Sequence, residues 1–201
     1  MAAPIFKTIP EQLERRLTHE ILSGLLEPGQ PLREQELSKR FGVSRGPVRE
    51  VLNRLTQQGL VVAEPNKGVR IASQPSAALR PLLVELRKRT ELFVLDSIFE
   101  DISEENLADW TRILGDIERA CRAGDTTTLV QHDLSFHRAI IESHPDKDVV
   151  LLWTPVALRM LIHYERLGDL MESYREHKAI VDAVRAGDKR AALRALETNI
   201  Q

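Results

Sequence analysis

Two arginines in the first quarter of the chain have the spacing of side chains that bind DNA. Arg45 and Arg49 are four residues apart, so both would leave the same face of a helix. Ser44 could cap this helix with its side chain, and Pro47 is tolerated in the first turn, where its missing N–H has no intrahelical partner. Because Arg is the usual bidentate reader of guanine, we interpret residues 44–49 as the start of a recognition helix.

Further polar residues would lie beside the same groove of the DNA. Arg33 and Gln35 open the preceding helix, and Gly46 would let the backbone approach DNA closely. Lys67 and Arg70 fall on a predicted wing, from which they could reach phosphate or the minor groove. A random pair of arginines is more often a pair of solvated helix charges. Here the turn, the cap and the wing all occupy the places that a DNA-binding motif requires.

A second group of residues has the spacing of metal ligands. Asp133 and His137 are four residues apart and leave the same helix face, and His177 on a later helix could supply a third ligand. One oxygen and two nitrogen ligands can bind a divalent cation between facing helices. The spacing alone more often reflects an Asp that orients a His with no metal present.

A third group consists of polar residues on otherwise apolar helix faces, namely Arg87, Arg138, Arg159, His163 and Tyr164. An arginine in the cavity of a helical bundle is a natural anchor for a carboxylate ligand. For each of these residues taken alone, a surface salt bridge is the commoner explanation.

The N-terminal elements predict a winged helix. A capping box begins at Thr8 and opens a first helix that Gly24 ends, and further helices are expected at about 33–41 and 44–58. Two short strands at 60–63 and 69–72 would then form the wing.

Beyond a polar linker at 73–76 the pattern is helical throughout. Six helices are expected, at about 79–100, 104–123, 126–143, 147–165, 169–186 and 188–200. Their short connections predict an antiparallel bundle, in which Trp110 and Trp153 would be core or dimer-interface anchors. The fold class is therefore mainly α, with a winged helix-turn-helix domain over residues 1–74 and an all-α domain over 75–201.

The composition is that of an ordinary globular protein. Of the 201 residues, 42% are hydrophobic and 29% are charged, and no apolar run approaches the roughly 20 residues that cross a membrane. We also expect no secretory signal, because the N-terminus lacks a charged segment followed by an apolar core. Cys121 is the only cysteine, which excludes an intrachain disulfide and fits a cytoplasmic location.

The net charge of −2 is unevenly distributed. Residues 1–75 hold 11 Lys and Arg against 8 Asp and Glu, whereas residues 76–201 hold 17 against 22. This modest polarity would turn the N-terminal part toward phosphate. No nucleophile elbow, phosphate-binding loop, dinucleotide fingerprint or CxxC pair occurs, which argues against the common enzyme classes.

Several segments together resemble the GntR family of bacterial transcription regulators, in the FadR subfamily that carries an FCD ligand-binding domain. The N-terminal signature reads ILSGLLEPGQPLREQELSKRFGVSRGPVREVLNRLTQQGL, with NKGVRI in the wing. The second half resembles FCD domains through LVELRKRTELF, DLSFH, EHKAIVDAVRAGD and ALRALETN. Six C-terminal helices resemble the smaller, VanR-like group.

The resemblance implies roles for individual residues. DNA contacts would come from Gln35, Ser44, Arg45, Gly46, Arg49, Lys67 and Gly68. Metal ligands in this family are one Asp and three His, which correspond here to Asp133, His137, His177 and, in place of the third His, Asn199. An Asn carbonyl is a poor zinc ligand but an acceptable ligand of harder ions, so zinc, nickel and manganese are all considered. A small organic acid would bind beside the metal, with Arg87 as a candidate anchor.

The leading hypothesis is a ligand-responsive regulator that binds a palindromic DNA operator as a homodimer. One alternative is a DNA-binding dimer whose metal site is vestigial because of Asn199. A much weaker one is a metal-dependent hydrolase in which Asp133, His137 and His177 activate water, which would leave residues 32–72 unexplained.

Overall fold

The structure is a computed structural model that describes residues 8–64, 68–162 and 169–200. The chain divides into two compact units, Met1–Pro75 and Ser76–Gln201. Each unit has its own hydrophobic core, and each is described separately below.

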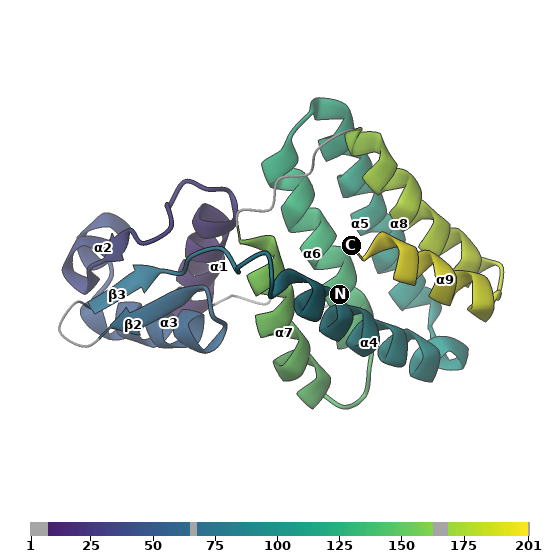
Figure 1. Ribbon diagram of the computed structural model, residues 1–201, viewed down its shortest axis with the longest axis horizontal. Helices are drawn as coiled ribbons and strands as arrows, with labels where there is room; N and C mark the ends of the chain where they lie inside the picture. Colours follow the sequence, from purple (N-terminus) through teal and green to yellow (C-terminus); the bar gives the residue numbers. More distant parts are fainter. Residues whose placement is uncertain (1–7, 65–67, 163–168, 201) are drawn as a thin grey trace. The chain divides into compact units, whose positions relative to one another are not determined.

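The first unit is a three-helix domain with a small antiparallel sheet (Figure 1). Its elements are α1 (Ile9–Leu22), β1 (Pro31–Leu32), α2 (Glu34–Phe41), α3 (Arg45–Gln57), β2 (Val61–Glu64) and β3 (Gly68–Ile71). The strand order is β1-β3-β2, with Pro31 and Val62 both opposite Arg70. The sequence predicted the hairpin of β2 and β3 but missed β1, because two residues are too few to show an alternating pattern.

The core of this unit forms where α1 packs on α3. Leu17 and Ile21 of α1 and Val48, Val51 and Leu55 of α3 are completely buried. These positions recur every three or four residues, as the apolar stripe of an amphipathic helix requires. The packing fixes α3 by its inner face and leaves its N-terminal outer face exposed.

The helix starts confirm one expected cap and correct another. Thr8 forms a complete capping box with Glu11, as expected. Ser44 occupies the N-cap position of α3 with an extended backbone, but its side chain makes no capping hydrogen bond. The third residue of α3 is Pro47, which has no N–H to donate, so the usual partner of an N-cap hydroxyl is missing.

The second unit is an all-helical bundle (Figure 1). Its elements are α4 (Arg80–Ile98), a short 3-10 turn η1 (Phe99–Asp101), α5 (Glu104–Ala123), α6 (Thr126–Glu142), α7 (Asp148–Leu161), α8 (Leu170–Arg185) and α9 (Lys189–Asn199). These are the six helices expected from the sequence, and the mainly helical fold class is confirmed. Helix α7 ends before the predicted limit, and His163 and Tyr164 lie outside the described residues.

Helix α4 packs against α6, α7 and α9, and α5 packs against α6 and α8. Trp110, Phe136 and Trp153 are completely buried, so both tryptophans belong to the core of this unit. Asp125, Asp169 and Asp188 cap α6, α8 and α9 with their side chains. Among the described residues, no helix combines the length and apolar character that a membrane span needs.

Candidate functional site

The N-terminal end of α3 presents a polar surface on the first unit. Ser44, Arg45, Gly46 and Arg49 are all exposed. A methyl group added at Gly46 would touch nothing within 4 Å, so the packing of this chain does not itself require glycine there. Among the described residues, Arg45 has no side-chain hydrogen bond or salt bridge partner, and its guanidinium is available to another molecule.

Arg49 is held differently, by Glu34 at the start of α2. The Arg49 Nε donates to Glu34 Oε1 at 3.0 Å and Nη2 donates to Oε2 at 2.9 Å, which is a bidentate pair. These hydrogen bonds lower the pKa of Glu34 and raise the pKa of Arg49. Arg49 remains largely exposed, so DNA phosphate could compete for it. The sequence analysis did not single out Glu34, although its place at the start of α2 was a usable signal.

The remaining DNA-binding candidates lie on α2 and on the wing. Gln35 is exposed, and Arg33 contacts Glu36 at 3.1 Å. Gly68 opens β3 with a φ of +80°, a conformation that favours glycine. Arg70 donates through Nη1 to the carbonyl of Gly29 at 3.0 Å.

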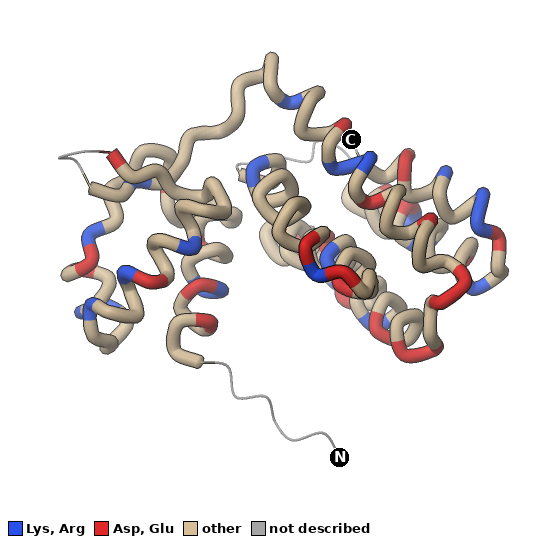
Figure 2. Tube along the Cα trace, turned by 90° about the horizontal axis from the view of Figure 1, so that it is seen from below, with Lys and Arg blue, Asp and Glu red and all other residues tan. Residues whose placement is uncertain are grey.

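Lys67 lies outside the described residues, so its expected place on the wing stays a prediction. Both Lys or Arg and Asp or Glu occur along the described trace of each unit (Figure 2).

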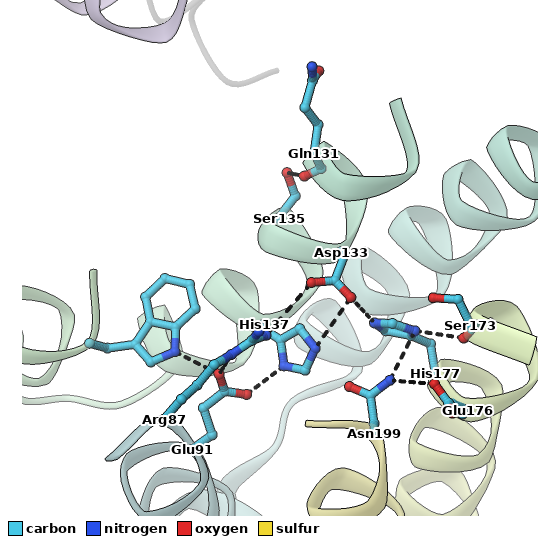
Figure 3. A network of polar contacts seen from close by, with 11 residues as sticks. Arg87, Glu91, Gln131, Asp133, Ser135, His137, Ser173, Glu176, His177 and Asn199 are labelled. Atoms are coloured by element: carbon cyan, nitrogen blue, oxygen red, sulfur yellow. Dashed lines mark hydrogen bonds and ion pairs between the residues drawn. The ribbon is translucent and has the colours of Figure 1, made fainter. Parts of the chain in front are cut away.

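The second unit contains a cluster of polar side chains from α4, α6, α8 and α9 (Figure 3). Helix α6 supplies Asp133 and His137, and α8 supplies His177. His177 Nε2 lies 3.3 Å from Asp133 Oδ1, and His137 Nε2 lies 3.9 Å from the same oxygen. One ligand atom from each of the three residues lies within 4.8 Å of the others. The structure thus brings together the three ligands that the sequence suggested.

The hydrogen bonds around the two rings decide which nitrogen faces the cluster. His177 Nδ1 lies 2.7 Å from the carbonyl oxygen of Ser173, which can only accept, so Nδ1 carries the proton. His137 Nδ1 lies 2.5 Å from the Glu91 carboxylate, which requires the same arrangement. Both Nε2 atoms are buried and have no hydrogen-bond partner in the described part of the chain. With both Nδ1 atoms donating elsewhere, the two Nε2 atoms and a carboxylate oxygen converge on one point.

Asn199, at the end of α9, lies beside this cluster. Its Nδ2 is 3.3 Å from His177 Nδ1 and 3.5 Å from Glu176 Oε2, and its Oδ1 is buried with no hydrogen-bond partner among the described residues. A buried carbonyl oxygen without a partner costs free energy, which a cation or a water molecule would recover. The contact is with His177 Nδ1, the ring nitrogen that faces away from Asp133, so the role of Asn199 as a fourth ligand stays a prediction.

The other side of the cluster is formed by Arg87 and Glu91 of α4. Arg87 is buried, donates through Nε to Glu91 Oε1 at 2.7 Å and places Nη2 3.7 Å from Asp133 Oδ2. The indole of Trp153 also donates to Glu91 Oε1, at 2.7 Å. Glu91 was not among the residues expected from the sequence. Its spacing of four from Arg87, on the buried face that continues through Leu95 and Ile98, was the signal that could have revealed it.

The electrostatics of the cluster keep its acids ionised. Burial alone would raise the pKa of Asp133, but its contacts with His177, His137 and Arg87 outweigh it and hold that pKa below its usual range. Burial lowers the pKa of His137, which favours the neutral ring. A neutral imidazole and an ionised carboxylate are the states that bind a metal.

The other polar candidates of the bundle make different contacts. The Arg138 guanidinium lies 5.9 Å from the ring centre of Trp153 and 3.7 Å from Glu142. Arg159 is partly buried, which lowers its pKa. Arg87 is thus the candidate anion anchor that the structure places in direct contact with the Asp133 cluster.

This donor set fits a divalent first-row cation. Two imidazole nitrogens suit zinc and nickel, and a carboxylate with an amide oxygen moves the preference toward manganese. The observation that supports the fit is the set of three buried atoms, two ring nitrogens and the Asn199 oxygen, that lack hydrogen-bond partners within residues 8–64, 68–162 and 169–200.

Comparisons with known proteins match both units. Residues 10–71 match the family model described as "Bacterial regulatory proteins, gntR family", and residues 82–201 match the FCD domain. The transcriptional repressor NanR of Cronobacter sakazakii is 31% identical over 221 residues, which cover 96% of this chain and 83% of that protein. YdhC, an uncharacterized HTH-type transcriptional regulator of Bacillus subtilis, is 27% identical over 188 residues. The match covers 90% of this chain and 83% of YdhC.

Solved structures show the same fold. The structure of Escherichia coli McbR/YncC superimposes with a TM-score of 0.83, at 22% identity, over 98% of this chain and 95% of that one. This likeness supports the arrangement of elements within each unit.

Proposed function

This chain belongs to the GntR family of bacterial regulatory proteins and carries an FCD domain, and it is a transcriptional regulator rather than an enzyme. We propose that its DNA binding responds to a small organic acid held beside a divalent cation. The observation that carries the proposal is the convergence of His177 Nε2 and His137 Nε2, at 3.3 and 3.9 Å, on Asp133 Oδ1.

The first unit would bind DNA through the N-terminal end of α3. Arg45 and Arg49 are exposed there, with Ser44 and Gly46 beside them, and Gln35 and Arg33 lie at the start of α2. Lys67 and Gly68 of the wing complete the proposed set. A helix that enters the major groove with its N-terminus uses this kind of surface, and a homodimer would place two such helices on a palindromic operator.

The second unit would hold the cation through Asp133, His137, His177 and Asn199. A bound cation supplies positive charge that attracts an anion, and Arg87 adds a fixed positive charge to the same cluster. Because two imidazoles and two oxygens form the set, we expect manganese, nickel or zinc rather than magnesium or calcium. The natural ligand of this charge distribution is a small carboxylate.

Binding of the acid regulates the protein only if it differs between the DNA-bound and the free state. Any change that the acid causes in DNA affinity must then appear as an equal change that DNA causes in the affinity for the acid. This reciprocity provides an internal check.

The test uses DNA selected by the full-length protein from a random pool. Its affinity is measured by fluorescence anisotropy for the metal-free protein, for protein loaded with Mn²⁺, Ni²⁺ or Zn²⁺, and for each form with a panel of mono-, di- and tricarboxylates. We expect at least one acid to change the DNA affinity of the loaded protein but not of the metal-free protein. An Arg87→Met variant should respond less to the acid.

Asn199 also supports a second candidate function. The resemblance to FCD domains implies a histidine at the position of Asn199, so the chain could be a DNA-binding dimer with a vestigial cation site. In that case no metal or carboxylate would change the DNA affinity, and the Asn199→His variant would gain metal binding without gaining a response.

A further inference from the structure

Glu91 is the most completely enclosed acidic side chain of the described part of the bundle. It lies on α4, its exposed fraction is 0%, and it contacts donors from three helices: Arg87 on α4 itself, His137 on α6 and Trp153 on α7 (Figure 3). A buried carboxylate is tolerated only when its oxygens are fully hydrogen-bonded. Glu91 meets this condition, so its contacts are well defined.

The two oxygens of Glu91 have different partners. Oε1 accepts from Arg87 Nε and from Trp153 Nε1, both at 2.7 Å. A guanidinium and an indole can only donate, so the atom at this position must be an acceptor. Oε2 faces His137 Nδ1 at 2.5 Å. An imidazole nitrogen can donate or accept a hydrogen bond. The group at the Oε2 position therefore decides whether His137 Nδ1 donates or accepts.

We propose that Glu91 is a positioning residue that fixes His137 in the Nδ1–H tautomer and thereby directs the Nε2 lone pair at Asp133 and His177. The inference rests on the cation site of the proposed function. His137 Nε2 is buried, lacks a hydrogen-bond partner among the described residues and points to within 3.9 Å of Asp133 Oδ1. Carboxylates that hold the second nitrogen of a ligating histidine act in this way on metal affinity.

The Glu91→Gln variant tests the proposal because its amide has nearly the same shape as the carboxylate. The amide oxygen of the variant must take the Oε1 position, since both partners there only donate. The amide NH₂ must then take the Oε2 position and donate to His137 Nδ1. His137 is forced into the Nε2–H tautomer, and a proton replaces the lone pair that faced Asp133.

The first measurement is the tautomer of His137, by long-range ¹H–¹⁵N NMR of the full-length metal-free protein at mildly alkaline pH. We expect the Nδ1–H form in the wild type and the Nε2–H form in Glu91→Gln. The second is a Co²⁺ titration followed by visible absorption, in which the variant should bind about 10- to 100-fold more weakly. Glu118→Gln is the matched control, because Glu118 also pairs with an arginine four residues away but on the surface.

The outcomes separate this inference from the proposed function. If the wild type binds no Co²⁺, the cation site fails, whereas the NMR tautomer still decides the role of Glu91. An Nε2–H form of His137 in the wild type overturns the inference, even if Glu91→Gln does not fold. Weaker Co²⁺ binding in Glu91→Gln with an unchanged tautomer would also overturn it, since Glu91 would then act through its charge alone.

Discussion

Arg45 and Arg49 lie on the same face of α3, yet their guanidinium groups can offer different contacts to DNA. Two of the three nitrogens of Arg49 are committed to Glu34 through bonds of 3.0 and 2.9 Å, whereas Arg45 has no such partner among the described residues. A bidentate contact to guanine needs two guanidinium nitrogens. We therefore predict that Arg45 reads a base and that Arg49 contacts phosphate.

The two substitutions to alanine should then have different signatures. A base-reading arginine contributes roughly 1–3 kcal/mol to specific binding, so Arg45→Ala should weaken binding to the selected DNA about 5- to 150-fold and leave binding to unrelated DNA nearly unchanged. Arg49→Ala should weaken binding to both DNAs equally. It should also reduce the slope of log K against log salt concentration by about 0.9, the value for one phosphate contact.

The assay is fluorescence anisotropy over a series of salt concentrations, with selected and scrambled duplexes. Arg89→Ala, an exposed arginine of the second unit that pairs with Glu85, controls for the loss of one positive charge. Equal losses on both duplexes for Arg45→Ala, or a sequence-dependent loss for Arg49→Ala, would refute the assignment. Glu34→Gln should strengthen non-specific binding, because it removes a negative charge and frees Arg49.

Three further predictions concern the second unit. Asn199→His should raise Zn²⁺ affinity in competition with a chromophoric chelator, because a third imidazole replaces an amide oxygen; unchanged affinity would place Asn199 outside the site. Phe136→Ala should lower the free energy of unfolding of the unit by about 3–5 kcal/mol in urea, because Phe136 is completely buried and contacts the rings of His137 and His177. A loss under about 1 kcal/mol, on the order of a surface substitution, would contradict this. Burial would raise the pKa of Glu91, but its contacts with His137 and Arg87 lower it from 4.5 to about 2. Stability from this group is therefore present above pH 4.5 and lost as the pH falls toward 2. Tryptophan fluorescence measures this loss in the second unit alone, since both tryptophans lie there, and an unfolding midpoint that does not change over that range would contradict it.

Much of the fold could be predicted because its signals are local. The helices of the second unit follow from apolar periodicity and from Asp residues at their starts, and the observed limits lie close to the expected ones. Strand β1 could not be predicted, because its two residues pair only through a partner far along the chain. The absent Ser44 cap required attention to the third residue of the helix, where Pro47 removes the donor.

The candidate site was predictable only in part. The spacing of Asp133 and His137 places them on one helix face, and this local rule holds in the structure. That His177 joins them depends on how α8 packs within the bundle, which spacing cannot show. Glu91 was missed because a glutamate that ends the polar run at 87–91 is usually a solvated charge, and only the tertiary contacts with His137 and Trp153 reveal that it is buried.

The cation site formed by Asp133, His137 and His177 is the centre of the proposed regulation, and the metal content of the protein tests it most directly. Purified full-length protein is dialysed against Mn²⁺, Ni²⁺ or Zn²⁺ and its bound metal is measured by mass spectrometry, beside the isosteric variant Asp133→Asn. We predict stoichiometric binding of at least one of these ions by the wild type and loss of that binding in the variant. No bound ion in the wild type, or equal binding by both proteins, would contradict the site.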